Sequence, residues 1–365
     1  NGAMQVAQRG TSFAGLTNAT GGYTLDRWAF GEGGAPTGVF TVTQDTDSPD
    51  GFASSLKWDC TTADAALAAS DYYATAYRIE GQDLQHLNYG SAAASETTLS
   101  FWVKSNKIGS YVAWVYAPDG VRQYQVPYTI DVADTWENKT GVIPADTAGT
   151  INNDNGSGLL LSFALASGTT YTSGTAPTSW EANLAADNYA GLTVNLADNT
   201  ANYWNITGVQ LEVGDTATPF EHRSYAQELT LCQRYYEVDN PNTPTSFGGN
   251  MRAQAYHPTN GSGGPLNRDG PFQPFKVDKR GGPTVTTYAY NGTTGAVSGI
   301  IIMDNMNITA ATFAADVIEG VSENTSIKAT IDGINMAVPL DPSNRHYAEI
   351  MRQVEAGTLV VQEAT

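Results

Sequence analysis

The sequence predicts a mostly β protein: a jelly-roll β-sandwich, then a short helix and a smaller β-rich C-terminal domain. Three observations carry this prediction. Charged residues make up only 15% of the chain, while Gly, Tyr, Thr, Ser, Ala and Asn are abundant, a composition suited to pleated surfaces and tight turns. Many short runs of alternating or β-branched residues are bounded by Gly, Asn and Asp. Helical periodicity is confined to two short segments.

Short strands fill residues 1–223. Each is a run of apolar, aromatic or β-branched residues, and turn clusters such as Pro118-Asp119-Gly120 separate them. The expected strands are 23–30, 38–43, 54–58, 72–79, 98–103, 111–116, 123–130, 136–143, 159–165 and 203–213. Many short strands without a long helical period indicate a sandwich or jelly roll.

A strong helix signal closes this first block. Ser224 can cap the first turn, and Gln227 occupies the capping-box position three residues later. An apolar stripe at helical spacing follows, formed by Leu229, Cys232, Tyr235 and Tyr236. Such a stripe suits packing on the sandwich or on a neighbouring chain. We therefore expect the first domain, with its helix, to span residues 1–238.

A Pro-, Gly- and Asn-rich stretch over residues 239–250 indicates a boundary or a long loop. The remainder, 239–365, is predicted to be a smaller β-rich domain that ends in a short helix. Its expected strands are 252–256, 272–277, 284–290, 299–303 and 326–331. Residues 344–356 have a helical period, with Gly357 at the expected stop, and 358–362 could add a short strand.

Composition excludes several classes of partner. The net charge of −19 argues against nucleic acid, because phosphate neutralisation needs clustered Lys and Arg. No apolar stretch approaches the ~20 residues that span a bilayer, so no membrane insertion is expected. The first residue is Asn1 and not Met, so we expect either processing or a true start further upstream. Cys60 and Cys232 could pair, but two buried free thiols are the favoured interpretation.

No catalytic motif is present. The HExxH, GxSxG, P-loop and Rossmann patterns are absent, and the four histidines are isolated from one another. Carboxylate pairs of the kind that cleave glycosidic bonds can be drawn by chance among 37 acidic residues. We therefore assign no catalytic residue and expect neither enzyme activity nor a cofactor, with a glycan depolymerase as an alternative.

A structural calcium ion is a minority hypothesis. The acidic loop 44–50 concentrates hard oxygen donors on Asp45, Asp47 and Asp50, which are ligands that Ca²⁺ prefers. The EF-hand spacing is absent, however, and Asx-rich segments are more commonly plain turns.

The aromatic residues offer candidates for stacking on sugar rings. Trp180 and Tyr171 lie in polar, loop-like sequence and are the better surface candidates. Trp102 and Trp114 lie in alternating apolar strands, so for them core packing is the favoured interpretation.

The most specific feature is residues 208–236, GVQLEVGDTATPFEHRSYAQELTLCQRYY. This segment resembles one that recurs in phage tail-fibre and related virion proteins, where a last sandwich strand runs into a capped helix that ends in Cys-Gln-Arg-Tyr-Tyr. Residues 1–12 (NGAMQVAQRGTS) look like the entry to the same domain, and residues 23–28 (YTLDRW) resemble its first strand. The resemblance is spread over roughly the first two-thirds of the chain.

The resemblance implies a tail-fibre-like structural protein of the phage virion, which presents a receptor- or glycan-binding surface for host attachment. It also implies a homotrimer, with other virion proteins and a host surface glycan as partners. The structural or interchain residues that it indicates are Glu221, Arg223, Gln233, Arg234, Tyr235 and Tyr236. The alternative is a purely architectural component, such as a capsid decoration or a fibre adaptor. A surface cluster of Trp and Tyr would favour the first function, and a self-complementary apolar face the second.

Overall fold

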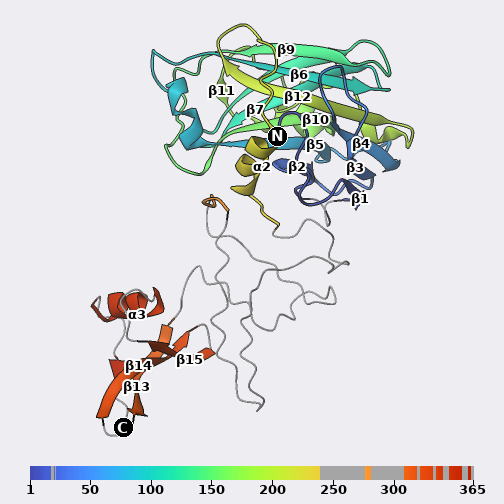
Figure 1. The fold of residues 1–365 in the computed structure, drawn as a ribbon. Coiled ribbons are helices and arrows are strands. Elements are labelled where there is room, and N and C mark those ends of the chain that lie inside the picture. The colour runs from blue at the N-terminus through green and yellow to red at the C-terminus, as the bar shows by residue number, and fades with distance from the viewer. Residues whose placement is uncertain are drawn as a thin grey trace. The chain divides into compact units, whose positions relative to one another are not determined.

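The structure is a computed structural model, which describes residues 1–238 apart from 18, 19 and 21, the segment 276–280, and five elements between 308 and 362. The chain divides into two compact units (Figure 1). The first comprises 1–251 and 272–281, and the second 252–271 and 282–365. The described segment 276–280 therefore belongs with the sandwich, although the predicted boundary lies at 238.

Twelve strands build the described part of the first unit. They are β1 Ser12–Leu16, β2 Trp28–Gly33, β3 Val39–Asp45, β4 Ser55–Thr62, β5 Tyr72–Glu80, β6 Thr97–Ser105, β7 Gly109–Ala117, β8 Arg122–Ile130, β9 Glu137–Ile143, β10 Ser157–Ser167, β11 Glu181–Ala182 and β12 Tyr203–Val213. They form two six-stranded sheets, ordered β1-β3-β4-β12-β6-β9 (the β4 sheet) and β11-β8-β7-β10-β5-β2 (the β7 sheet). Adjacent strands are antiparallel, and the chain passes repeatedly between the sheets. The predicted jelly-roll sandwich is confirmed.

Alternation along each strand places one set of side chains between the two sheets. The largest fully buried side chains of this core include Trp28, Trp58, Trp204, Phe40, Phe101 and Phe163. Phe30 stacks on Trp58 with ring centroids 4.6 Å apart. Burial of so much aromatic area is the main stabilising contribution to the sandwich. Trp102 does not join this core: Phe101 and Val103 face inward, while half-buried Trp102 lies against Gly208, so its predicted core position is wrong.

Each strand predicted within residues 1–223 overlaps an observed one, and the prediction 203–213 coincides with β12. Strand β2 starts later than expected, because Tyr23 forms only an isolated bridge to Ala29. Two short strands, β1 and β11, were not predicted, and neither were the 3₁₀ helices η1 Gly81–Leu87, η2 Ala185–Asp187 and η3 Leu196–Asp198 or the single-turn helix α1 Thr169–Thr172. These elements are too short to establish a period.

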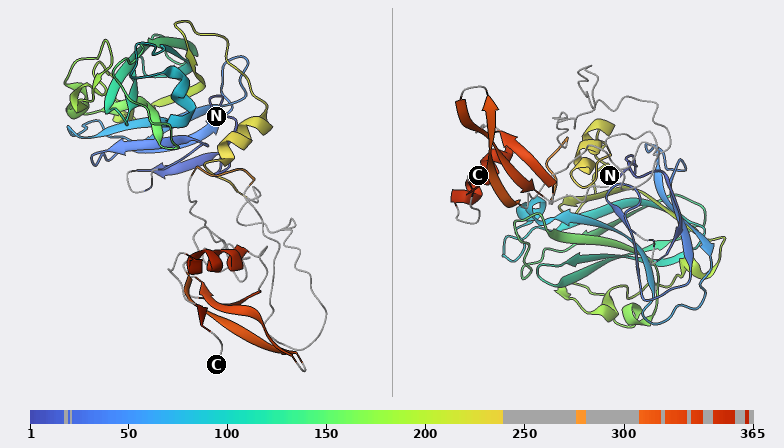
Figure 2. Two further views of the ribbon diagram at one scale, coloured as in Figure 1. Left: turned by 90° about the vertical axis from the view of Figure 1, so that its left-hand side faces the viewer. Right: turned by 90° about the horizontal axis from the view of Figure 1, so that it is seen from below.

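Helix α2 spans Tyr225–Gln233 and lies beside the N-terminal residues (Figure 2). The Ser224 hydroxyl accepts a hydrogen bond from the Gln227 backbone N–H, and Gln227 Oε1 accepts one from the Ser224 backbone N–H, so the predicted capping box is confirmed. Cys232 faces the sandwich and is buried. The helix ends before Tyr235, which leaves the last two tyrosines of the motif in the following turn.

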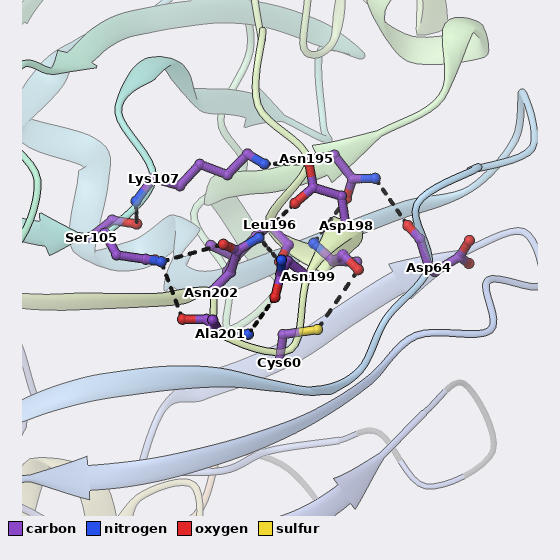
Figure 3. Close-up of polar contacts among 12 residues, drawn as sticks. Cys60, Asp64, Ser105, Lys107, Asn195, Leu196, Asp198, Asn199, Ala201 and Asn202 are labelled. Atoms are coloured by element: carbon purple, nitrogen blue, oxygen red, sulfur yellow. Dashed lines mark hydrogen bonds and ion pairs between the residues drawn. The ribbon is translucent and has the colours of Figure 1, made fainter.

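Both cysteines are buried free thiols, the favoured interpretation. Cys60 lies beneath the Asn-rich loop 195–202 that leads into β12, and its thiol contacts the carbonyl oxygen of Ala197 at 3.7 Å (Figure 3). Asn202 donates to the Leu196 carbonyl oxygen at 3.0 Å, and the Lys107 ammonium pairs with the Asp198 carboxylate. These hydrogen bonds and this ion pair therefore stabilise the conformation of the loop itself.

The described part of the second unit consists of five elements. They are β13 Ile308–Ile318, β14 Val321–Ile331, β15 Ile334–Pro339, α3 Arg345–Glu355 and β16 Val361–Gln362. The strands form a sheet ordered β15-β14-β13-β16, in which β16 is parallel to β13. The predictions for 326–331, 344–356 and 358–362 correspond to β14, α3 and β16, whereas β13 and β15 were not predicted. The predicted strands 252–256, 284–290 and 299–303, and 272–277 up to residue 275, lie outside the described residues.

Candidate functional site

Both faces of the β7 sheet carry apolar side chains. On β7 itself Tyr111 and Val115 point into the core between the sheets, whereas Val112 and Trp114 belong to a separate apolar cluster on the opposite, outer face. The prediction that Trp114 is a core residue is thus corrected: it is only 9% exposed, but it is buried outside the sandwich core. The outer face carries the candidate site.

Strand register defines this outer face as three rows of side chains. They are Arg78-Leu160-Tyr116-Gln123, Ala29-Ala76-Ser162-Trp114-Gln125 and Gly31-Ala74-Ala164-Val112-Pro127. The positions on β2, β5 and β10 are mostly Gly, Ala or Ser, and the bulk stands on β7. We call this surface the outer face of the β7 sheet. The small residues on β2, β5 and β10 therefore lie beside the larger, aromatic side chains on β7.

Five rings form what we call the aromatic cluster: Tyr72, Trp114, Tyr116, Tyr171 and Tyr189. The Trp114 and Tyr116 rings stack with centroids 5.0 Å apart and an interplanar angle of 11°. The Tyr72 and Tyr171 rings meet edge to face at 5.2 Å. Trp114 and Tyr189 are buried, while Tyr72, Tyr116 and Tyr171 are half-buried. Half-buried rings on fixed neighbours are suited to binding a flat apolar surface.

Hydrogen bonds hold the cluster in place. The Trp114 indole nitrogen Nε1 donates to Gln123 Oε1 at 3.0 Å, and Gln123 Nε2 donates to the Glu181 carboxylate at 2.9 Å. The hydroxyls of Ser162 and Tyr189 lie 3.2 Å apart. Burial raises the pKa of Tyr189, and it also raises that of Tyr72. Both phenols therefore stay neutral, as hydrogen-bond donors, throughout the physiological pH range.

The two predicted stacking residues have different positions. The prediction that Trp180 lies at the surface is wrong, because this side chain is 7% exposed and belongs to the core between the sheets. Its Nε1 donates to the Pro144 carbonyl oxygen at 2.7 Å. The surrounding polar sequence belongs to the loop, while the ring turns inward. Tyr171, on the short helix α1, is half-buried and joins the aromatic cluster.

The Cys-Gln-Arg-Tyr-Tyr residues make contacts within the chain. Arg234 binds the buried carboxylate of Glu80 with two hydrogen bonds of 2.8 Å, and the Tyr235 hydroxyl donates to the same carboxylate. The Arg27 guanidinium lies between the rings of Tyr235 and Tyr77, 3.5 and 4.5 Å from their centroids. This arrangement, the Glu80 clamp, supports the structural role predicted for the motif.

The other motif residues differ in burial. Arg9 lies over the Tyr236 ring, 3.6 Å from its centroid, and Gln233 is buried. Glu221 and Arg223 are exposed and 4.0 Å apart, a surface ion pair worth about 0–1 kcal/mol. Contacts of these residues with another chain stay a prediction.

The acidic loop does not bring its three aspartates together as metal ligands. The Asp47 carboxylate accepts from the Lys104 ammonium at 2.7 Å and from Trp136 Nε1 at 3.0 Å. Asp45 accepts from the Asp47 amide at 2.9 Å, and Asp50 is exposed. Within the described part of the chain, no group of three or more His, Cys, Asp or Glu residues is arranged to hold a metal ion. The contacts of this loop are those of a turn, and a structural calcium ion stays a prediction.

The comparisons with known proteins give no family. No family model matches the chain, and no curated protein matches it. Several solved structures are similar to the sandwich. The enzymatically active domain of tailspike protein 4 from bacteriophage CBA120 has a TM-score of 0.29 and 12% identity, over 52% of this chain and 20% of that one. The chain thus spans about a fifth of the length of that tailspike domain.

Two further similar structures are shorter. The family 11 carbohydrate-binding module of a Clostridium thermocellum cellulase has a TM-score of 0.27 and 11% identity, over 53% of this chain and 90% of that one. A putative sugar binding protein from Bacteroides thetaiotaomicron has a TM-score of 0.29 and 13% identity, over 57% and 97%. These values describe a likeness of fold alone. No helix in the described residues is long and apolar enough to cross a membrane.

Several residues of the candidate site were missed at the level of sequence. Trp114 and Tyr116 stand two residues apart in a strand, so they share a face. That signal was available, but β7 reads GSYVAWVYA and is apolar on both sides, so the sequence does not say which side is the core. Tyr189 and Arg78 do not belong to any sequence motif that would have indicated them. Cross-strand register is what brings these residues together.

Proposed function

We propose that the sandwich is a glycan-binding module whose ligand surface is the outer face of the β7 sheet. The observation that carries this proposal is the half-buried Tyr116 ring, stacked on a Trp114 ring that is itself fixed by Gln123. Sugar rings bind such faces through their C–H groups, while nearby phenols and amides bind hydroxyls. Tyr72 and Tyr171 extend the same surface.

The aromatic cluster favours this function over a purely architectural one. An architectural component would need a contiguous, self-complementary apolar face. The large apolar side chains that are exposed among the described residues lie instead on several separate loops, strands and helices: Tyr23, Ile108, Val121, Val132, Val142, Leu184, Val213, Tyr225 and Leu231. Rings gathered on one sheet face are more consistent with a ligand surface.

The wider setting is also a proposal. The resemblance of residues 208–236 to tail-fibre segments supports a place on the surface of a phage particle, where a homotrimer would present the glycan-binding face to the host and contact other virion proteins. Light scattering at micromolar protein concentration should give the mass of a trimer, and a monomer would contradict this part. Immunolabelling of intact particles should place the chain on the tail or fibre.

We propose binding without cleavage. The buried carboxylates of Asp26 and Glu80 are already used in structural contacts, the first with Gln8 and the second with Arg234. A polysaccharide that the protein binds should therefore release no new reducing ends after prolonged incubation. Their appearance in proportion to protein concentration would instead identify a depolymerase.

The first prediction tests the ligand face itself. Tyr116→Ala removes the half-buried ring and should weaken glycan binding at least tenfold, in keeping with roughly 1.4 kcal/mol or more for a lost stacking contact. Binding is measured by isothermal titration calorimetry on the whole chain, after a glycan array has identified ligands. Tyr225→Ala, which removes an exposed ring on α2, is the matched control and should leave affinity unchanged. An equal loss in both variants would contradict the proposed face.

A further inference from the structure

Arg78 is the one charged side chain in the three rows of the outer face of the β7 sheet. It is exposed on β5 and shares a row with Leu160 and Tyr116. Its guanidinium forms no ion pair or hydrogen bond with another residue that the structure describes. Arg78 also lies on the same face of β5 as Tyr72, with the small side chains of Ala74 and Ala76 between them.

Nearby carboxylates do not neutralise Arg78. Glu80 stands two residues further along β5, and its carboxylate is occupied by Arg234 and Tyr235. Glu181 accepts from Gln123. In a chain with a net charge of −19, Arg78 thus has no ion-pair partner among the described residues, although it shares a row with Tyr116 of the aromatic cluster. Arginine binds carboxylates through two parallel hydrogen bonds from a planar fork, so a ligand suited to Arg78 carries a carboxylate.

We infer that the outer face of the β7 sheet takes carboxylate-bearing glycans, with Tyr116 stacking on a sugar ring and Arg78 binding a uronic or sialic acid carboxylate. This inference rests on the proposed glycan-binding function. Two strand spacings separate Arg78 from Tyr116, about 10 Å, so one bound chain can contact both. Distant acidic residues repel such a ligand weakly, since charges are screened beyond about 8 Å at physiological salt.

The test compares acidic polysaccharides with their carboxyl-reduced forms. Polygalacturonate, alginate and polysialic acid are titrated into the whole protein beside the neutral, reduced version of each. Wild-type protein should bind at least one acidic form ten or more times more tightly than its reduced form. Arg78→Gln should abolish that ratio and leave affinity for the reduced form unchanged, whereas Arg78→Lys should keep part of it. Arg223→Gln, which changes an exposed arginine next to α2, is the matched control.

The outcomes separate the inference from the function on which it rests. Equal binding of acidic and reduced forms by the wild-type protein would overturn the inference, as would full selectivity in Arg78→Gln. In both cases the glycan-binding function would stand, provided that Tyr116→Ala still weakens binding. Failure of every polysaccharide to bind would overturn both.

Discussion

Among single residues, Glu32 has an environment that opposes its charge. It lies on β2 opposite Tyr73, and both carboxylate oxygens are buried without a hydrogen-bond partner among the described residues. Burial, together with the nearby Asp71 carboxylate, raises the pKa of Glu32 to about 7. The Asp71 carboxylate accepts hydrogen bonds from the amides of Ala35 and Ala68, which hold it near Glu32, where it disfavours a second negative charge.

Glu32 should make the sandwich less stable as pH rises. The folded state holds the Glu32 proton more tightly than the unfolded chain, whose pKa is about 4.3. Its contribution to stability is therefore complete below that value and is lost as pH rises toward 7. Glu32→Gln should flatten this dependence and raise the free energy of unfolding at pH 8 by about 1 kcal/mol, a value reduced for partial solvent access. Urea unfolding at pH 5, 6.5 and 8, followed by tryptophan fluorescence, measures it.

The exposed residue Glu96 provides the control for this experiment. Glu96→Gln should leave the slope of stability against pH as it is in the wild type. The prediction would be contradicted if the free energy of unfolding of the wild type rose between pH 5 and 8 and Glu32→Gln followed the same curve. Ionisation of Glu32 would then not destabilise the folded state.

Residue types alone could not assign the aromatic side chains. Trp180 lies in polar sequence and is buried, whereas Tyr116 lies in an apolar strand and is partly exposed. Whether a ring is exposed depends on which face of its strand meets the other sheet and on what the loops cover. A strand that is apolar on both faces, such as β7, leaves that choice to tertiary packing.

At the scale of elements, α2 is held by the Glu80 clamp. Arg234→Ala would leave the buried Glu80 carboxylate with the Tyr235 hydroxyl and without its cation. Such a loss costs roughly 3 kcal/mol when a buried pair is broken, so the free energy of unfolding should fall by about 2–3 kcal/mol, because the Arg234 side chain itself is 29% exposed. Burial opposes ionisation of Glu80, but the hydrogen bonds from Arg234 and Tyr235 outweigh it and lower its pKa, and the variant should lose this effect.

Chemical denaturation measures the stability of this variant, and hydrogen exchange of the α2 amides locates the loss. Arg234→Lys should recover only part of it, since a lysine cannot form both parallel hydrogen bonds. Arg223→Ala removes a half-exposed cation that pairs with Glu221 and with Glu228 of α2; because Glu228 keeps the Asn1 ammonium, this control should cost no more than about 1 kcal/mol. If Arg234→Ala lowered the free energy of unfolding no more than this control does, the Glu80 clamp would not be what holds α2 on the sandwich.

Periodicity predicted most elements because most are long enough to show a period. The run 203–213 alternates over its full length and became β12, and the capping box placed the start of α2 at Ser224. The short strands β1 and β11 follow no period and pair only because neighbouring strands offer a free edge. In the acidic loop 44–50, the Asp47 carboxylate pairs with Lys104, 57 residues further along the chain, a contact that no local sequence pattern indicates.

At the scale of the whole molecule, the chain returns to the sandwich after the predicted boundary. Lys279 pairs with Glu237 at 2.5 Å, and both side chains are largely buried. The Arg280 amide donates to the Arg234 carbonyl oxygen at 3.2 Å, next to the Glu80 clamp. Sequence composition gave no reason to separate 276–280 from the rest of 239–365, because a contact with a distant surface leaves no local pattern.

These contacts predict how shortened chains behave. A protein of residues 1–281 should melt at the temperature of the sandwich in the whole chain, whereas residues 1–238 should melt several degrees lower. The lost ion pair and hydrogen bonds are worth about 1–2 kcal/mol together, or about 2–8 °C for a unit of this size. Lys279→Ala in the 1–281 protein should reproduce most of the difference, and Arg78→Ala, which removes an exposed cation without an ion pair among the described residues, should not. Equal melting of 1–238 and 1–281 would show that the sandwich is complete at 238, and the predicted boundary would then stand.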